Sequence, residues 1–560
     1  MRTFFFRKLT IGLSLLAVFA LCLALLGLTR LAAYAAGTSI TLSKASGPPG
    51  TQVTMKGNDF GASEIVTLTF DGALIGTTVT TNGGGFFTGF TVPKRTQPGN
   101  HTVQATGQSS GNSATAPFLV PVPITLSVNT GPPTTQVTVT GAHFAARETV
   151  VVTFDVTTTL GTTTTTGAGS FTLVISIPTS AVPGKHAIQA TGQSSGRTGS
   201  QFFVVRTNWP VFGEDKRHSH SNPYENVLSP TNVAHLVLDW HSTTGAAVDI
   251  SSPTIVDGVL YIGSWDHNVY AFNATTGAKR WDFVTGDIVL SSPTVNNGVM
   301  YVGSWDYNVY ALNATTGVKL WNYPTGDMIN SSPEVVNGIV YIGSADHNMY
   351  ALNAKTGAEL WSYTTGNSIW SSPAVVNGIV YIGSADHNVY ALNAKTGAKL
   401  WSYTTGNSID ISAPAVANGI VYIGSWDHNV YALNATTGAK LWSYTTGDII
   451  YSSPAVVNGV VYIGSDDNGL YALDATTGTK LWSYATGGLC VSSPTVANGV
   501  VYVGSDSHVL YALGAKTGSM LWSYTTGDLV RSSPTVVNGM VYIGSEDHNV
   551  YAFHLPSAQP

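Results

Sequence analysis

Eight equivalent positions of this chain differ in residue type although the sequence around them hardly changes. Each lies directly before a Ser-Ser-Pro-type triplet, within a unit of about forty residues that recurs eight times. The positions are Ile250, Leu290, Asn330, Trp370, Ile411, Tyr451, Val491 and Arg531. Constant positions of a repeat hold its fold, so the variable ones are free to bind a ligand. An Arg, a Trp, a Tyr and an Asn around one opening can form a ligand site.

Three acidic residues accompany this column. Asp249 and Asp410 are extra residues just before it in the first and fifth units, and Glu334 stands where other units have Thr or Ala. The first and fifth units stand opposite one another in a ring of eight. The sequence therefore predicts a pocket whose members are Asp249, Asn330, Glu334, Trp370, Asp410, Tyr451 and Arg531. The alternative is that surface loops simply vary.

A second variable column follows a Gly-Ser pair in each unit. Its members are Trp265, Trp305, Ala345, Ala385, Trp426, Asp466, Asp506 and Glu546. One side of the ring is thus aromatic and the other acidic. Exposed Trp265, Trp305 and Trp426 can stack on sugars or contact a protein partner. Ordinary packing at the edge of the sheets is the alternative.

A histidine recurs at one turn of most units, which invites a metal-site interpretation. The residues are His267, His347, His387, His428 and His548. Zinc requires several ligands at about 2 Å, whereas neighbouring sheets pack about 10 Å apart. The flanking Asp and Asn are typical of a tight turn with positive φ. We therefore predict turn chemistry here and no metal site.

The elements that position these residues are four short strands in each unit. In the unit Ser371 to Trp401 they are residues 373–376, 379–383, 389–393 and 399–403, separated by Asn-Gly, Asp-His-Asn and Thr-Gly turns. No stretch shows helical periodicity. Four strands in forty residues indicate a propeller blade. Strand parity then places both variable columns on the same face.

The ends of the repeat region complement each other. The last unit supplies only three strands, and residues 236–242 form a strand that no unit precedes. Pairing the two closes the ring and removes exposed sheet edges. The sequence predicts an all-β chain with an eight-bladed propeller at residues 236–553, followed by a tail at 554–560.

The third turn and fourth strand carry a family resemblance. The stretch Ala311 to Trp321, ALNATTGVKLW, resembles the tryptophan-docking motif of pyrroloquinoline quinone (PQQ) dehydrogenases and their non-enzymatic propeller relatives. In this chain Asn usually replaces the motif's Asp, and Lys sits one place late. The resemblance implies that each Trp stacks on the next blade. These structural docking residues are Trp240, Trp281, Trp321, Trp361, Trp401, Trp442, Trp482 and Trp522.

The resemblance also raises the question of a cofactor. PQQ alcohol dehydrogenases hold the quinone over the channel mouth with a Trp, an Arg, calcium bound by Glu and Asn or Asp, a catalytic Asp and often a vicinal Cys pair. Trp370, Arg531, Glu334, Asn330 and Asp410 have suitable types, but no motif fixes them in these roles. Cys490 is the only Cys beyond the leader, so a vicinal pair is impossible. The long insertions that roof the cofactor are also missing.

The residues before the propeller divide into a leader, two modules and a lead-in. Residues 1–36 contain an early basic cluster, an apolar run at 9–28 and a small-residue cleavage site, which predict a signal peptide or an uncleaved membrane anchor. Residues 37–121 and 122–206 are a duplication that resembles the Ig-like β-sandwiches of bacterial surface proteins. They act either as spacers or in adhesion. Residues 207–235 are a linker in which His218 and His220 are interpreted as polar linker residues.

Composition limits the functions that the chain can have. The net charge of −6 without a basic run argues against nucleic acid. We predict a monomeric secreted or cell-surface binding or scaffold protein, with a protein or glycan partner and no assigned catalytic residue. The alternatives are a PQQ- and calcium-dependent alcohol or sugar dehydrogenase and a carbohydrate-binding protein.

Overall fold

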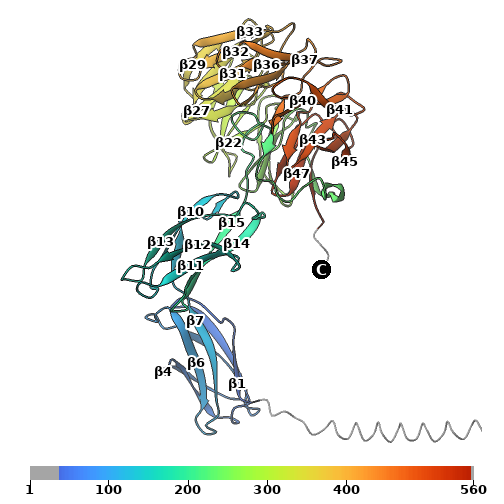
Figure 1. Cartoon of the computed structure of the whole chain (residues 1–560). Helices are drawn as coiled ribbons and strands as arrows, with labels where there is room; N and C mark the ends of the chain where they lie inside the picture. Colours follow the sequence, from blue (N-terminus) through green and yellow to red (C-terminus); the bar gives the residue numbers. More distant parts are fainter. Residues whose placement is uncertain (1–36, 557–560) are drawn as a thin grey trace, which may run out of the picture. The chain divides into compact units, whose positions relative to one another are not determined.

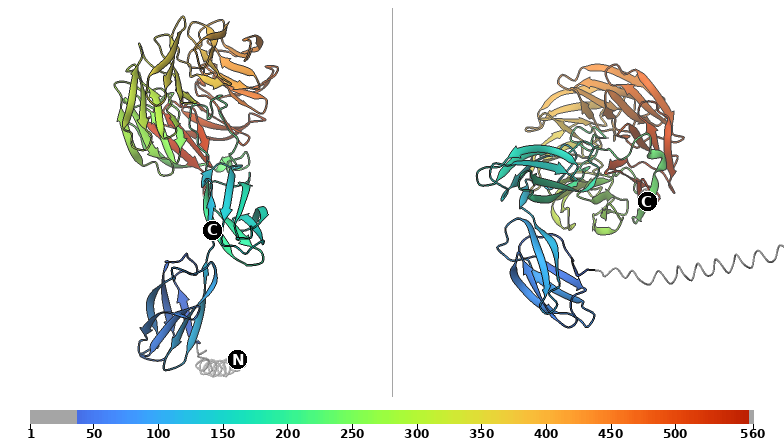
Figure 2. Two further views of the ribbon diagram at one scale, coloured as in Figure 1. Left: turned by 90° about the vertical axis from the view of Figure 1, so that its left-hand side faces the viewer. Right: turned by 60° about the horizontal axis from the view of Figure 1, so that its bottom comes forward.

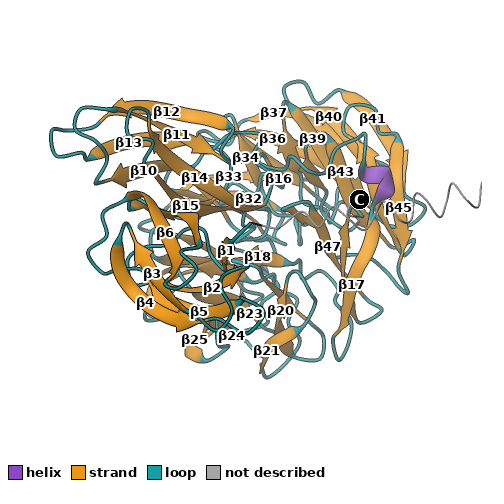
Figure 3. Cartoon of the chain, turned by 90° about the horizontal axis from the view of Figure 1, so that it is seen from below, coloured by secondary structure: helices purple, strands orange, loops and turns teal. Residues whose placement is uncertain are grey.

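The computed structural model describes residues 37–556 (Figure 1). Within this range nearly all regular structure is strand, and one short 3-10 turn, η1 (Val233–His235), is the exception (Figure 3). The all-β prediction is thus confirmed. The chain forms two compact units, one comprising most of residues 37–203 and the other residues 204–556 with two short segments before them. The predicted leader at residues 1–36 lies outside the described residues.

The first half of the N-terminal unit is a two-sheet sandwich. Its strands are β1 (Ser39–Leu42), β2 (Gln52–Asn58), β3 (Ile65–Phe70), β4 (Ala73–Val79), β5 (Phe86–Thr91), β6 (Gly99–Gly107) and β7 (Ser113–Val120). The sheets have the orders β1-β2-β5 and β4-β3-β6-β7. Alternating residues of both sheets bury a common core that includes Met55, Leu68 and Phe118. Glu64 joins two hairpin ends, because its carboxylate accepts hydrogen bonds from Gly61, Ser109 and Ser110.

The duplicate repeats this arrangement. Its strands are β8 (Ile124–Leu126), β9 (Thr130–Gly131), β10 (Gln136–Gly141), β11 (Thr149–Phe154), β12 (Thr158–Thr164), β13 (Phe171–Ser176), β14 (Gly184–Gly192) and β15 (Thr198–Val205). They form sheets of order β13-β10-β8 and β12-β11-β14-β15-β9. Glu148 is the equivalent of Glu64, and its carboxylate accepts hydrogen bonds from the backbone N–H groups of Ala145, Ser194 and Ser195. The duplication therefore preserves a buried carboxylate as well as the core.

Residues 204–556 contain eight antiparallel sheets. The sheets are arranged around one axis (Figure 2, right). The innermost strands are β18 (Thr254–Val256), β22 (Thr294–Asn296), β26 (Glu334–Val336), β30 (Ala374–Val376), β34 (Ala415–Ala417), β38 (Ala455–Val457), β42 (Thr495–Ala497) and β46 (Thr535–Val537). The second strands are β19 (Val259–Gly263), β23 (Val299–Gly303), β27 (Ile339–Gly343), β31 (Ile379–Gly383), β35 (Ile420–Gly424), β39 (Val460–Ser465), β43 (Val500–Ser505) and β47 (Met540–Ser545). The third strands are β20 (Asn268–Asn273), β24 (Asn308–Asn313), β28 (Asn348–Asn353), β32 (Asn388–Asn393), β36 (Asn429–Asn434), β40 (Gly469–Asp474), β44 (Val509–Gly514) and β48 (Asn549–His554). The outer strands are β21 (Lys279–Val284), β25 (Lys319–Pro324), β29 (Glu359–Thr364), β33 (Lys399–Thr404), β37 (Lys440–Thr445), β41 (Lys480–Ala485), β45 (Met520–Thr525) and β17 (Val237–Thr243).

Local sequence explains the sheets. Innermost and second strands are joined by a two-residue turn such as Asn377-Gly378, where both residues have positive φ (51° and 79°). This is the turn whose twist matches a β-hairpin, and Asn and Gly tolerate it best. The second and third strands are buried on both faces because each sheet packs between two others. The β-branched and aromatic residues of these strands supply that packing.

The ring closes through the strand that precedes the repeats. β17 pairs antiparallel with β48 and becomes the outer strand of the sheet that ends the chain. The innermost strand of that sheet, β46, also contacts β18, so the last sheet adjoins the first. A short strand from the lead-in, β16 (Ser221–Asn222), adds to the inner edge of the β42 sheet.

Each outer-strand Trp joins its sheet to the next one. The Trp401 indole donates to the carbonyl of Ala435 at 3.0 Å, and its ring covers Gly438 (φ 72°). A Cβ at Gly438 would lie 2.7 Å from that ring. Seven of the eight docking residues make the same bond to the equivalent Ala, and Trp522 donates instead to Leu236. The docking motif therefore needs glycine for close approach as well as for the turn.

A related set of hydrogen bonds to these alanine carbonyls is incomplete between the seventh and eighth sheets. Tyr341 and its equivalents donate to them, but among the described residues the buried Tyr502 hydroxyl has no partner. We expect Tyr341→Phe to lower the free energy of unfolding by about 1 kcal/mol, because it removes a made hydrogen bond. Tyr502→Phe should be neutral or stabilising. Urea denaturation of both variants checks this, and equal losses would contradict it.

A ring of serine hydroxyls surrounds the channel. The second Ser of each triplet donates its backbone N–H to the hydroxyl of the next one, as from Ser252 to Ser292 and, across the seam, from Ser533 to Ser252. The ring is broken once, because Ala413 replaces serine after Ser372. Ala413→Ser should complete it and raise the free energy of unfolding by about 0.5–1 kcal/mol. Urea denaturation would show this, with Ser292→Ala as the opposite control. A destabilised Ala413→Ser variant would be the contrary result.

Candidate functional site

The lead-in segment occupies the propeller channel. Residues 207–222, here called the plug, run past the innermost strands in chain order. The backbone contacts are Trp209 with Ile255, Pro210 with Val295, Lys216 with Val375, Arg217 with Val416, Ser219 with Val456 and His220 with Val496. Thr207 and Asn222 both bond to the last sheet, at Asn538 and Val536. The segment expected to be a linker thus makes one circuit inside the ring.

Buried polar groups lie within the plug. His218 and His220 are each 1% exposed, and the Phe212 ring contacts both edge-on, with centroids 5.6 and 4.9 Å away. His218 Nε2 lies 3.9 Å from a carboxylate oxygen of Glu334. Burial lowers the pKa of His218 to about 4 and that of His220 to about 3, and raises that of Glu334 to about 8. The interpretation of the two histidines as polar linker residues is therefore wrong, because the plug buries them.

Above the plug, the first variable column surrounds a small well at the channel mouth. Phe212 and the serine ring line it together with all eight residues that precede the triplets. Asn330, Trp370, Tyr451 and Arg531 therefore meet there, as the sequence predicts. Their side chains fill most of the space and leave a cavity of about 40 Å³, enough for roughly three water molecules.

The two variable columns form one site. In three cases a residue after Gly-Ser in one sheet contacts the residue 25 positions later, which precedes the triplet of the next sheet. Trp305 donates its indole N–H to Asn330, and the Trp426 and Tyr451 rings meet edge-to-face at 5.3 Å. We call the outer positions the rim and the inner ones the wall. Rim and wall residues thus make pairs between sheets. The sequence prediction considered the two columns as separate surfaces and did not include these pairs.

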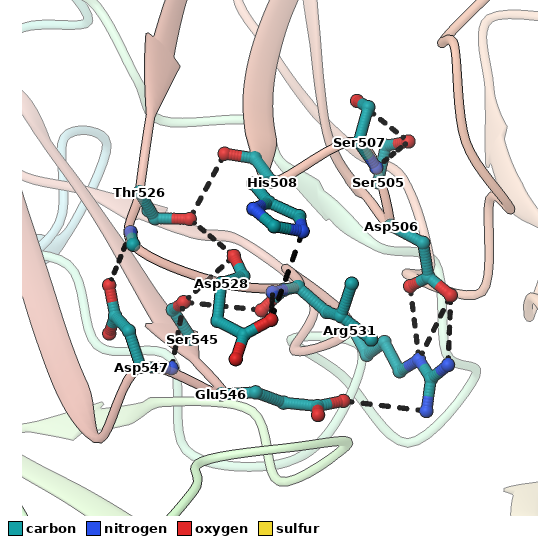
Figure 4. A network of polar contacts seen from close by, with 12 residues as sticks. Ser505, Asp506, Ser507, His508, Thr526, Asp528, Arg531, Ser545, Glu546 and Asp547 are labelled. Carbon is teal, nitrogen blue, oxygen red and sulfur yellow. Dashed lines mark hydrogen bonds and ion pairs between the residues drawn. The ribbon is translucent and has the colours of Figure 1, made fainter.

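The most charged pair lies on the acidic side. Arg531 makes a two-pronged ion pair with Asp506 at 2.8 and 3.0 Å, and its other nitrogen lies 3.4 Å from Glu546 (Figure 4). Asp249 faces Glu546 from the first sheet, and the seam between last and first sheets runs through this group. The hydrogen bonds from Arg531 to Asp506 are the main reason that the pKa of Arg531 is raised.

The remaining predicted pocket residues do not line the well. Glu334 is 2% exposed and faces His218 of the plug. This contact explains why the third unit has Glu at a position where the other units have Thr or Ala. Asp249 and Asp410 are absent from its lining, and burial raises their pKa values to about 7 and about 6. On the rim, Trp265 is 40% exposed, whereas Trp305 and Trp426 are half-buried. Of the three candidate aromatic residues, Trp265 offers the most open face.

The recurring histidines occupy left-handed turn positions. His267, His347, His387, His428 and His548 have φ between 69° and 75°, and Tyr307 shares this conformation. In residues 37–556 no group of three His, Cys, Asp or Glu side chains is arranged to hold a metal ion.

Comparison with known proteins identifies the repeats. The sequence profile described as PQQ_2, outer membrane protein assembly factor BamB, matches residues 190–332, 327–411, 407–494 and 486–557. The chain belongs to this family. The predicted PQQ-like propeller is therefore confirmed. No curated protein matches the chain in sequence.

Solved structures with a similar fold include two dehydrogenases and BamB. A europium-containing methanol dehydrogenase aligns with a TM-score of 0.56 at 15% identity, over 62% of this chain and 98% of that one. A quinohemoprotein alcohol dehydrogenase from Comamonas testosteroni gives 0.54 at 17% identity, over 63% and 81%. BamB from Moraxella catarrhalis gives 0.49 at 20% identity, over 57% and 99%. At these identities the likeness to the enzymes establishes the fold alone.

The residues at the mouth do not fit PQQ and calcium. A cavity of about 40 Å³ is far below the roughly 300 Å³ of a small ligand pocket. Arg531 is already held by Asp506 and Glu546. The candidate calcium ligand Glu334 is buried against the plug and does not line the well with Asn330 and Trp370. The side chains at the mouth of this chain therefore leave too little space for a quinone.

Proposed function

We propose that this protein is an exported, non-catalytic binding protein whose eight-bladed propeller holds a protein partner at its mouth face. The observation that carries the proposal is the filled well beneath a rim of varied side chains. A uniform frame presents Trp265 and the partly exposed Arg531 and Glu546 to solvent, while the cavity is too small for an organic substrate. The family description as an assembly factor supports a partner-binding role.

The rest of the chain fits an extracytoplasmic platform. The basic start and apolar run of residues 1–36 favour export with cleavage or anchoring, and the two Ig-like sandwiches suit a spacer. No helix in residues 37–556 is long and apolar enough to cross a membrane. We infer a monomer that reaches its partner through the mouth alone.

Site-specific photo-crosslinking tests the proposal in the producing cell. A benzoylphenylalanine at position 265 should give one discrete adduct, whereas one at Lys395, an exposed turn on the opposite face, should give none. The adduct's partner, once purified, should bind the native protein and bind the Trp265→Ala variant at least tenfold more weakly. Equal labelling from both faces would contradict the proposal.

A titration of PQQ with calcium separates this proposal from the dehydrogenase. We expect no saturable heat. Saturable binding lost in Trp370→Ala or Arg531→Ala would assign the mouth to an enzyme. Glycan binding abolished by Trp265→Ala would instead assign it to carbohydrate.

A further inference from the structure

Four carboxyl groups at the mouth share a single guanidinium. Asp466, Asp506, Glu546 and Asp249 come from the sixth, seventh, eighth and first sheets, and we call them the acidic arc. Arg531 is the cation among them, and it is committed to Asp506 and Glu546 (Figure 4). Side-chain exposures of 10% for Asp506, 19% for Glu546 and 31% for Arg531 leave the group reachable from the mouth. The arc is therefore under-neutralised.

The arc also contains acceptors that lack a donor. Asp249 is 8% exposed and Asp466 is 9% exposed, and the buried Oδ1 atom of each has no hydrogen-bond partner. Oε1 of Glu546 likewise accepts no hydrogen bond, although it lies 3.4 Å from Arg531. A buried acceptor without a donor is costly, and a buried charge more so. Asp466 thus lacks a donor in this region of the mouth, and Asp249 and Glu546 can bond to each other only when one of them carries a proton.

Near neutral pH, protonation of a carboxylate in the arc partly offsets the excess of negative charge. Burial raises the pKa of Asp249 to about 7, and the facing carboxylates Glu546 and Asp506 add to the rise while Arg531 opposes it. Burial also raises the pKa of Glu546, with Asp506 and Asp528 adding to the rise and Arg531 opposing it. An incoming cation would take the place of this proton, so its binding should release a proton.

We infer that the acidic arc binds the ammonium group of a lysine presented by the protein partner. This inference rests on the proposed function and names the partner's chemistry. An ammonium carries three donors on a compact head, whereas a guanidinium is planar and broader. The small exposures of the Asp506 and Glu546 side chains, 10% and 19%, leave narrow access to their carboxylates, which favours the compact head. Tyr451 and Trp426, on the neighbouring pair, offer aromatic surface for the alkyl stem.

Calorimetry of the full-length protein with short peptides tests the inference. The probes are the capped tripeptides acetyl-Gly-Lys-Gly-amide and acetyl-Gly-Gln-Gly-amide. We expect the lysine peptide to bind at least tenfold more tightly at pH 8, and tenfold more weakly at pH 6 than at pH 8. Binding at pH 7 should release protons, seen as a heat that changes with the ionisation enthalpy of the buffer. Equal binding of the two peptides would overturn the inference.

Variants locate the binding. Asp249→Asn and Glu546→Gln should each weaken the lysine peptide at least tenfold, while Asp327→Asn, a matched acid of another link on the same face, should not. Thermal melts of all three establish that they fold. Spermidine or calcium binding more tightly than the lysine peptide at the same residues would assign the arc to a free polyamine or a metal ion. If the native protein does not bind the lysine peptide but still crosslinks to a partner from position 265, the inference about lysine is wrong and the proposed function is retained.

Discussion

Trp401→Ala should lower the free energy of unfolding by about 3–5 kcal/mol, the loss expected when a large buried aromatic side chain is removed. Trp401 is 8% exposed, donates to Ala435, and packs between Tyr381 of its own sheet and Gly438 of the next. The substitution opens a cavity at a sheet-to-sheet contact and leaves a buried carbonyl with one donor fewer. Equilibrium urea denaturation measures the loss.

The adjacent residue provides the control. Leu400 is 50% exposed on the outer strand, and Leu400→Ala should change the free energy of unfolding by less than about 0.5 kcal/mol. Trp401→Phe should fall between the two, since it keeps the ring and loses the indole donor. A loss below about 1 kcal/mol for Trp401→Ala would show that the docking contact is not the main link between sheets.

Acid should destabilise the propeller through the histidines of the plug. Both have pKa values below the ordinary 6.5, so the unfolded chain takes up protons first as the pH falls. Their contribution is complete above pH 6.5 and is lost between pH 6.5 and about 3, with a size on the order of several kcal/mol. Glu334, whose pKa is raised to about 8, acts oppositely: its contribution is lost as the pH rises from 4.5 to 8.

A double variant isolates this effect. His218→Gln with His220→Gln should flatten the fall in unfolding free energy between pH 4.5 and 3.5, and Glu334 is present in both proteins. His235→Gln, at an exposed histidine, should leave the fall unchanged. Urea denaturation at each pH gives the values. Parallel pH profiles for the native protein and the double variant would contradict the assignment. Asp215, whose charge favours protonation of His218, is present in both proteins.

Local rules made the repeat sheets predictable from sequence. The Asn-Gly turns have only one suitable hairpin conformation, and the constant Trp and Thr-Gly of each unit fix how sheets meet. The plug escaped prediction because residues 207–222 occur once, so no internal comparison exposes their role. Glu334 was placed at the mouth for the same reason: its partner His218 is more than a hundred residues away and belongs to no repeat.

The candidate site was predicted in two halves that the fold joins. Wall residues such as Asn330 and Arg531 were found because they vary against a constant background. Their rim partners Trp305 and Asp506 lie 25 positions earlier and in another sheet, so neither column alone reveals the pair. The signal was nevertheless present, since the complementary types Asp506 and Arg531 share that spacing. Sequence spacing could not predict that side chains fill the well, because this depends on the rotamers of the wall residues and on the position of Phe212.

The plug constrains the number of sheets in the propeller. Near-identical units are prone to duplication and deletion by unequal recombination, which would yield chains with seven or nine sheets. The plug meets successive inner strands over a fixed length of sixteen residues, from Thr207 to Asn222, and begins and ends on the same sheet. An added or missing unit would leave one of its ends without its strand. A single non-repeated segment can thus restrict the propeller to eight sheets, because chains with seven or nine sheets would not accommodate it.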